Sequence, residues 1–204
     1  NGVYKNALVI GAETLSKIMD WNDRSTCVLF GDGAGAAVVE VDSETNCKAK
    51  QPGAANKSGI LSMIQGSDGA RGEVLRCVNN PFAVNDTKLS YVSMNGQEVY
   101  KFAVKTVPKV IEEAVKKAGL EVGDIDLFVL HQANLRIIES VAKRLHQPME
   151  KFPTNLEECG NISAASVPIL LDNINKHGMI CEGKKIVLAG FGAGLTWGAT
   201  VLVW

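Results

Sequence analysis

The sequence predicts an α/β fold that contains two related halves, and three observations lead to that prediction. Apolar runs of strand length alternate along the chain with segments that show a helical period. Two stretches, VLFGDGAGAAVVEV (28–41) and VLAGFGAGLTWGATVLVW (187–204), share the pattern of strand, glycine turn and strand, which suggests a duplicated unit. His131 ends an apolar run and is followed at once by an amphipathic segment, as at a strand-to-helix junction.

The first part of the chain predicts short strands separated by turns. NALVIG (6–11) has the composition of a buried strand, and Ala12–Met19 is predicted as a helix or turn. Two more strands are predicted at Cys27–Phe30 and Ala36–Val41. The polar stretch 42–58 contains glycine and proline, so we expect a loop there.

The middle of the chain predicts one strand, an irregular excursion and a long helix. Gly59–Gln65 is predicted as a strand, and Asp68–Lys88 shows no clear period. A helical period of apolar residues then runs from Val99 to Ala118, and Pro108 inside it should kink or interrupt the helix.

The last part alternates strands and helices. Leu127–Leu130 is predicted as a strand, and the helix Asn134–Leu145 follows with Asn134 as its N-cap. Ser163–Lys176 is a second helix, with Gly178 as its C-terminal stop. Two strands, Lys185–Ala189 and Thr196–Val203, close the chain. The first of these helices should bury one face, made of Leu135, Ile138, Val141, Ala142 and Leu145.

Composition limits the classes of protein that the chain can represent. With 21 basic and 22 acidic residues among 204, its charge does not suggest a nucleic-acid or membrane-surface binder. No apolar run reaches the ~18 residues of a membrane span, and the start of the sequence does not read as a signal peptide. The cysteines lack the paired spacing of a metal or redox motif, which favours reduced thiols in a cytoplasm and no metal site. They are Cys27, Cys47, Cys77, Cys159 and Cys181.

The two glycine motifs are interpreted as features of the backbone. GDGAGA (31–36) precedes a strand-like run, whereas a dinucleotide fingerprint must open a helix, so we interpret it as a glycine-lined hairpin with close backbone approach. GFGAGLTWG (190–198) is either a bulged hairpin or a place where a backbone N–H points at a reacting oxygen.

His131 and Asn161 are the candidate pair for chemistry. Asn161 lies in GNISAAS (160–166), a tight turn before a helix, and His131 lies at the end of a strand. Strand ends and helix starts gather at one edge of the sheet in α/β folds. An imidazole and a carboxamide at that edge offer two N–H donors without a full charge, which suits an oxygen that becomes negative only during reaction. His146 and His177 are expected at helix ends, without chemistry.

Four motifs in order, DRSTCVLFGDGAGAAVV, LHQANLRII, GNISAASVP and GFGAGLTWG, closely resemble the β-ketoacyl-acyl-carrier-protein synthase III family of the thiolase superfamily. The resemblance covers essentially the whole chain. It implies a five-layer αβαβα fold made of two related halves, present here as the C-terminal part. Residues 1–89 would then be the end of the first half with a connecting excursion, and residues 90–204 the second half.

The resemblance implies a decarboxylative condensation of a short acyl-CoA with malonyl-acyl-carrier protein, with CoA thioesters as substrates and no cofactor. The family's nucleophilic cysteine is expected before the segment that corresponds to Asn1, so the 204 residues alone should be inactive. Cys27, in a predicted buried strand, and Cys159, without a helix start of its own, lack the surroundings of a nucleophile.

Matching motif positions give each site residue an implied role. His131 and Asn161 should donate hydrogen bonds to the thioester enolate, and the backbone N–H of Ala193 should occupy a second oxyanion position, where many relatives have glycine. The resemblance also implies a homodimer, and the composition favours a cytoplasmic protein that binds neither nucleic acid nor a membrane. Substrate contacts are implied for Arg24, Phe30, Asn134 and Phe191, and carrier-protein contacts for Gln132, Ala133, Asn134, Leu135 and Arg136.

Two other functions stay open at this point. Another starter synthase of the thiolase superfamily would share the motifs and differ in its acyl group. A non-catalytic fragment that binds CoA or carrier protein would lack the nucleophile altogether.

Overall fold

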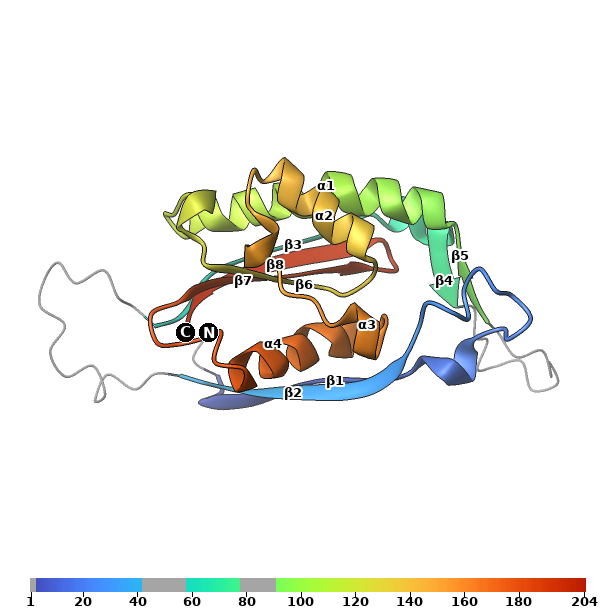
Figure 1. The fold of residues 1–204 in the computed structure, drawn as a ribbon, viewed down its shortest axis with the longest axis horizontal. Coiled ribbons are helices and arrows are strands. Elements are labelled where there is room, and N and C mark those ends of the chain that lie inside the picture. Colours follow the sequence, from blue (N-terminus) through green and yellow to red (C-terminus); the bar gives the residue numbers. More distant parts are fainter. Residues whose placement is uncertain (1–2, 42–57, 78–90) are drawn as a thin grey trace, which may run out of the picture.

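The computed structural model describes residues 3–41, 58–77 and 91–204, and these form four successive layers (Figure 1). Helices α1 and α2 cover one face of a four-stranded sheet of order β3-β8-β7-β6, and α4 covers the other face. The antiparallel pair β1–β2 lies against the far side of α4. The layered α/β fold predicted from the sequence is therefore observed. The elements of these layers are α1 (Gly96–Lys117), α2 (Leu135–Arg144), α4 (Ser166–Lys176), β1 (Asn6–Thr14), β2 (Asp32–Glu40), β3 (Gly59–Ser67), β6 (Leu127–Leu130), β7 (Lys185–Gly192) and β8 (Thr196–Val203).

Short elements connect these layers. The pair β4–β5 is a separate antiparallel ribbon beside the start of α1. Residues 42–57 of the predicted loop 42–58 and residues 78–88 of the predicted irregular segment 68–88 lie outside the described residues. The short elements are η1 (Leu15–Ile18), η2 (Gly69–Val74), β4 (Leu75–Cys77), β5 (Val92–Met94), η3 (Val122–Asp124), η4 (Met149–Lys151), α3 (Leu156–Cys159) and η5 (Ser163–Ala165).

Two hydrophobic cores hold the central sheet between its helices. The larger one lies under α1 and α2, where Phe128 stacks on Phe152 with ring centroids 4.6 Å apart. The smaller one lies between the sheet and α4, around Val129, Leu170 and Ile186. Because all four residues of β6 are buried, that strand reads as a continuous apolar run rather than an alternating one.

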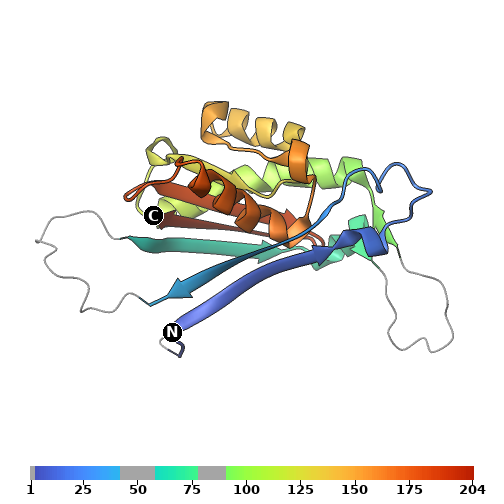
Figure 2. The same cartoon turned by 60° about the horizontal axis from the view of Figure 1, so that its bottom comes forward.

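Glycines let β2 approach α4 closely and let β1 approach η5, and Figure 2 shows the two strands from their own side of the molecule. A Cβ added at Gly35 would come within 2.9 Å of the Pro168 ring, and one at Gly11 within 2.4 Å of the Ala164 carbonyl oxygen. The close approach predicted for GDGAGA is thus correct, but the motif lies in β2, which pairs with β1, and not in a local hairpin. GFGAGLTWG does form a hairpin, between β7 and β8.

Several sequence predictions are wrong, and three of them have a reason in specific contacts. Residues 27–29 form turns instead of a strand, because the Asp23 carboxylate accepts hydrogen bonds from the backbone and hydroxyl of Ser25 and from the hydroxyl of Thr26. Only Phe30 makes a strand-like bridge, with Asn161. Leu135 is predicted on the buried face of helix α2, but it is 45% exposed and Ile137 is buried in its place. The reason is that Leu135 is the first residue of the helix, so its side chain lies at the helix end.

The third error concerns Pro108, which does not interrupt α1. The helix continues through it for 22 residues. A proline inside a helix costs about 3 kcal/mol. Burial of each large apolar side chain along the same helix, such as Val107 and Ile111, contributes about 1.5–3 kcal/mol. The packing of α1 on β3, β7 and β8 therefore outweighs the cost of the proline.

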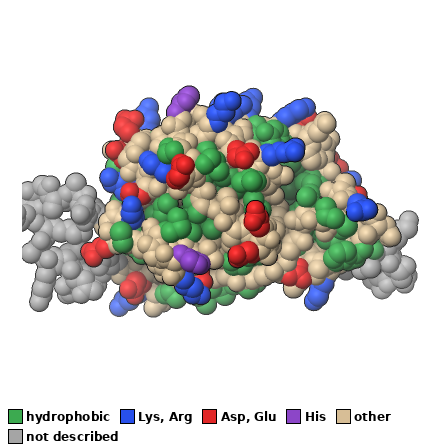
Figure 3. Space-filling view, in the orientation of Figure 1, with side chains coloured by type: hydrophobic (Ala, Val, Ile, Leu, Met, Phe, Trp, Pro, Cys, Tyr) green, Lys and Arg blue, Asp and Glu red, His purple; other side chains and the backbone are tan. Residues whose placement is uncertain are grey.

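The predicted boundary at residues 89 and 90 remains a prediction. Strand β3, which comes before it, pairs with β8 in the central sheet. NALVIG (6–11) forms strand β1 as predicted, but the expected burial is wrong: apolar side chains of β1 and β2 stand in solvent, with exposed fractions of 61% for Leu8, 61% for Ile10 and 73% for Val38. On the face drawn in Figure 3, charged side chains of both signs are interspersed.

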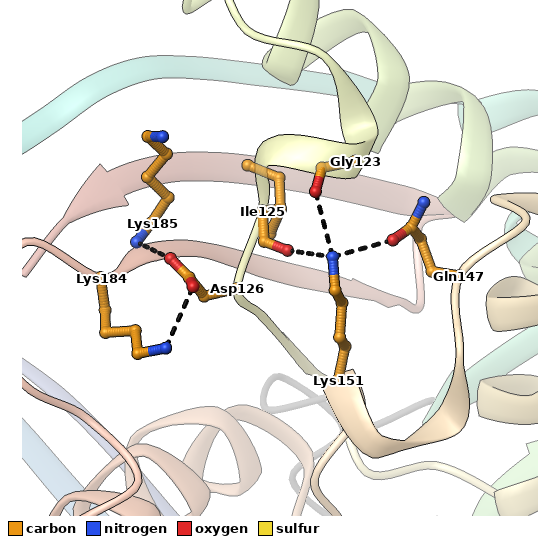
Figure 4. A network of polar contacts seen from close by, with 7 residues as sticks. All are labelled: Gly123, Ile125, Asp126, Gln147, Lys151, Lys184 and Lys185. Carbon is orange, nitrogen blue, oxygen red and sulfur yellow. Dashed lines mark hydrogen bonds and ion pairs between the residues drawn. The ribbon is translucent and has the colours of Figure 1, made fainter.

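A polar network fixes the start of β6 and of its parallel neighbour β7 (Figure 4). Asp126 accepts hydrogen bonds from the Lys184 ammonium at 3.0 Å and the Lys185 backbone N–H at 2.8 Å. The Lys151 ammonium donates to the carbonyl oxygens of Gly123 and Ile125, at 3.1 and 2.7 Å, and to the Gln147 side chain at 3.0 Å. These contacts anchor the strand that ends at His131.

We expect Lys151→Met to destabilise the protein by about 1–3 kcal/mol, because two backbone carbonyls lose a charged donor. Lys143→Met, on an exposed helical position, is the matched control and should change stability by less than about 0.5 kcal/mol. Urea denaturation of both variants measures the difference. Equal losses would show that the network does not stabilise the start of β6.

Candidate active site

His131 is held in place by its backbone and by both neighbours of its ring. Its backbone N–H donates to the Ala189 carbonyl at 2.7 Å, which extends the pairing of β6 with β7 by one residue. The ring packs edge-on against Phe191, with centroids 5.2 Å apart. Ring nitrogen Nδ1 lies 2.6 Å from the hydroxyl oxygen of Ser166, at the start of α4. The imidazole is therefore fixed between the central sheet and α4.

Asn161 is held equally firmly by the turn before α4. Its backbone N–H donates to Leu29, and its carbonyl accepts from Gly31, so it bridges to the segment before β2. Its side-chain oxygen accepts the Ser163 backbone N–H at 2.9 Å. Because the oxygen is committed to this bond, the amide nitrogen Nδ2 is the end of the side chain that remains for another partner.

His131 and Asn161 share the wall of one cavity of about 1050 Å³. Within the described residues, neither His131 Nε2 nor Asn161 Nδ2 has a hydrogen-bond partner. In that part of the chain the Asn155 carboxamide oxygen is the one side-chain polar atom both sealed from solvent and unpaired. Nε2 and Nδ2 are therefore not sealed from solvent, and both side chains line the same cavity.

Burial keeps the His131 imidazole neutral. It lowers the pKa of His131 from its ordinary 6.5 to about 4. The imidazole therefore carries no positive charge at neutral pH and has one proton, on either Nδ1 or Nε2. Such a group can polarise a carbonyl oxygen by donating a hydrogen bond without supplying a full charge.

Ala193 lies in the turn between β7 and β8, on the wall of the same cavity. Its carbonyl accepts the Thr196 hydroxyl at 2.9 Å, and no hydrogen bond within the described residues uses its N–H. Its φ is not positive, unlike that of Gly194 beside it. An alanine at this position is therefore compatible with the backbone.

The other predicted site residues separate into two groups. Phe30, Phe191 and Asn134 line the cavity, as do Ala133 and Arg136. Asn134 also caps α2 by accepting the Arg136 backbone N–H at 2.8 Å.

Arg24, Gln132 and Leu135 lie off the cavity wall. Arg24 is an exposed turn residue and Leu135 is half exposed, so both face solvent. Gln132 is fully buried, and its side chain joins the Leu130 carbonyl at 2.8 Å to the Asn155 backbone N–H at 3.3 Å. Its side chain acts inside the fold and is not available at the surface.

Sequence reasoning missed Ser166 and the ribbon β4–β5. Ser166 belongs to the motif GNISAAS, but no local pattern shows that its hydroxyl faces a histidine 35 positions earlier. Leu75, Cys77, Val92 and Met94 of the ribbon also line the cavity. They fell in or beside a segment interpreted as irregular, whose apolar residues show no period.

The described cysteines are distributed over several elements. Cys27 lies in a turn and not in the predicted buried strand, and Cys159 ends the short helix α3. Neither is on the cavity wall, whereas the exposed Cys77 is. Within the described residues no group of three or more His, Cys, Asp or Glu side chains could hold a metal ion. None of the described helices combines the length and apolarity required to cross a membrane.

Comparison with known proteins adds independent findings. Residues 115–204 match the family model described as 3-oxoacyl-[acyl-carrier-protein (ACP)] synthase III C terminal, and residues 1–69 match the model described as 3-oxoacyl-[acyl-carrier-protein (ACP)] synthase III. A curated β-ketoacyl-[acyl-carrier-protein] synthase III of Clostridium acetobutylicum is 48% identical over 210 residues, which are 100% of this chain and 60% of that protein.

Solved structures have the same fold. The β-ketoacyl-[acyl carrier protein] synthase III of Thermus thermophilus is 44% identical, with a TM-score of 0.87 over 100% of this chain and 60% of its own. The priming β-ketosynthase of the R1128 polyketide biosynthetic pathway is 35% identical, with a TM-score of 0.85 over 99% of this chain and 58% of its own. The fold is thus thiolase-like, and the chain spans about three fifths of the length of these relatives.

The buried neutral imidazole predicts how stability depends on pH. The folded-state pKa of His131, about 4, lies below the unfolded value of 6.5, so acid favours the unfolded state. The stability that the folded protein gains from keeping His131 neutral is fully present above pH 6.5. This stability is lost as pH falls toward 4, by about 3 kcal/mol in total. In denaturant unfolding from pH 7 to 4, His131→Gln should lose less stability than the wild type. An NMR titration that finds His131 protonating near pH 6.5 would contradict this.

Proposed function

The chain belongs to the 3-oxoacyl-[acyl-carrier-protein] synthase III family, and from this premise we propose that its site takes part in decarboxylative condensation. An acyl group passes from CoA to a cysteine thiolate, which releases CoA. Malonyl-acyl-carrier protein then loses CO2, and the resulting carbanion attacks the acyl thioester and displaces the thiolate. The products are 3-oxoacyl-acyl-carrier protein, CoA and CO2.

The observation that carries this proposal is the donor pair on one cavity wall. Loss of CO2 leaves an enolate whose oxygen is negative, and this species sets the height of the barrier. His131 Nε2 and Asn161 Nδ2 are both unpaired within the described residues, and neither is sealed from solvent. Two N–H groups preorganised toward one oxygen stabilise such a species without binding the neutral substrate equally well. In this proposal the Ala193 N–H stabilises the second oxyanion, at the acyl thioester.

The remaining cavity residues support binding of an acyl chain and a thioester arm. Phe191 packs against the His131 ring and Phe30 pairs with Asn161, so both supply apolar wall next to the donors, and Asn134 offers a polar group on the same cavity wall. Arg136 is the proposed anchor for the acidic carrier protein, because a guanidinium grips phosphate or carboxylate with two bonds. Arg24 remains proposed for the CoA nucleotide, as an exposed cation away from the cavity wall.

The acyl group, the assembly and the compartment are also part of the proposal. Acetyl-CoA is the proposed acyl donor, and the 35% identity to a priming β-ketosynthase of a polyketide pathway supports a different starter acyl group as the second candidate. A cytoplasmic homodimer is proposed with it. Leu8, Ile10 and Val38 expose apolar side chains on β1 and β2. Exposed apolar patches mark interaction sites, so these side chains support the proposal that another protein surface covers these strands.

We expect the 204 residues alone to give no condensation of acetyl-CoA with malonyl-acyl-carrier protein. The proposed thiolate is none of the described cysteines, and the relatives are longer than this chain. A hybrid with the part of the Clostridium acetobutylicum relative that this chain does not cover should form product, and the same hybrid with Cys77→Ala should still form product, because Cys77 is not the proposed nucleophile. Turnover by the 204 residues alone would refute this placement of the nucleophile.

In the hybrid, His131→Ala and Asn161→Ala should each lower the condensation rate by about 10²–10³, because each removes one donor from the enolate oxygen. Transfer of radiolabelled acetyl from CoA to the protein should persist in both variants. His177→Ala is the matched control, since that histidine is exposed and contacts only the end of α4. Loss of acetyl transfer together with condensation would overturn the assignment of these residues to the second step.

A further inference from the structure

The hydroxyl group of Ser166 has more neighbours than it has protons. Ser166 is 2% exposed, and its oxygen lies 2.6 Å from His131 Nδ1, 2.9 Å from the Ser163 carbonyl oxygen and 3.3 Å from the Gln132 backbone nitrogen. The Gln132 N–H can only donate and the Ser163 carbonyl can only accept. The one hydroxyl proton must therefore point either to His131 or to Ser163.

The direction of that proton determines the tautomer of His131. If the hydroxyl donates to Ser163, Nδ1 must donate to the hydroxyl oxygen, and Nε2 is then a bare acceptor on the cavity side. If the hydroxyl donates to Nδ1, the ring proton sits on Nε2, which becomes a donor. A neutral imidazole has one ring proton, so the two states exclude each other.

Two observations favour donation from Ser166 to His131. The distance of 2.6 Å lies in the range of O–H donors, about 2.5–3.0 Å, and below the usual range of N–H donors to oxygen, about 2.7–3.2 Å. The Ser163 carbonyl also accepts the Ser166 backbone N–H, so it keeps a partner when the hydroxyl turns away. Donation to Nδ1 therefore leaves no buried group of this cluster unpaired.

We propose that Ser166 is a positioning residue that holds the proton of His131 on Nε2. Its hydroxyl accepts the Gln132 backbone N–H and donates to Nδ1, which makes Nε2–H a fixed donor on the cavity wall. The use of that donor on an enolate oxygen rests on the proposed function. The placement of the proton itself does not.

Buried Gln132 holds this arrangement together from the other side. Its side chain joins the end of β6, at Leu130, to Asn155 at the start of α3. Its backbone N–H is thereby kept against the Ser166 oxygen and uses one of the two lone pairs of that oxygen. This contact holds the hydroxyl beside Nδ1 and is compatible with donation toward Nδ1.

The test is ¹H–¹⁵N NMR of the imidazole rings in the 204-residue chain at pH 7, where the two nitrogens of a neutral ring have well separated shifts. His131 is identified by its absence from the spectrum of His131→Gln. We expect wild-type His131 to show a protonated Nε2 and a bare Nδ1. A wild-type ring with the proton on Nδ1 would overturn the proposal, whatever the variants do.

Three variants test whether the Ser166 hydroxyl sets the tautomer of His131. Ser166→Ala should lose the single Nε2–H signal and populate the Nδ1–H form, because the donor to Nδ1 is gone. Ser166→Thr keeps a hydroxyl and should restore the wild-type pattern. Ser163→Ala removes a neighbouring hydroxyl and keeps the carbonyl, so the tautomer should not change. An unchanged Nε2–H ring in folded Ser166→Ala would show that Ser166 does not set the tautomer.

These outcomes are independent of the condensation assay. If the tautomer follows Ser166 but the hybrid forms no product, the positioning role stands and the proposed function fails. If the hybrid condenses its substrates but the tautomer ignores Ser166, the function stands and the positioning role fails. Each result therefore judges one statement alone.

Discussion

The hydrogen bond between His131 Nδ1 and the Ser166 hydroxyl is the contact on which the site depends. It joins the residue that follows β6, the edge strand of the central sheet, to the start of α4, which covers one face of that sheet. The polar network at Asp126 and Lys151 fixes where β6 begins, and the glycines of β2 let α4 and the turn at Asn161 approach. The fold therefore serves to bring one imidazole and one carboxamide to the same cavity wall.

Much of this arrangement could be predicted from the sequence because it follows from strand and helix order. β6, β8 and the capped helix α2 lie where their apolar patterns indicated, and His131 and Asn161 line one cavity because strand ends and helix starts share a sheet edge. Ser166 could not be predicted in the same way. Its role depends on a side-chain contact across 35 positions, and no local pattern records the direction of a side chain at that range.

Other features escaped because tertiary contacts overrode local preference. Residues 27–29 have strand-like composition, but the Asp23 carboxylate holds turns there, so the first copy of the repeated pattern lacks its leading strand. Pro108 is expected to kink or interrupt α1, but the helix continues through it because α1 packs against three strands of the central sheet. The part of the cavity wall that β4 and β5 form could not be predicted, because these strands lie in or beside a segment whose apolar residues follow neither a helical nor a strand period.

A double-mutant cycle on condensation by the hybrid shows whether His131 and Asn161 stabilise the same oxygen, as we propose. Rates of His131→Ala, Asn161→Ala and the double variant give the coupling between the two side chains. If both donors serve one enolate oxygen, the double variant should lose clearly less than the product of the two single losses. Losses that multiply in full would mean that the two side chains act independently, which contradicts the account.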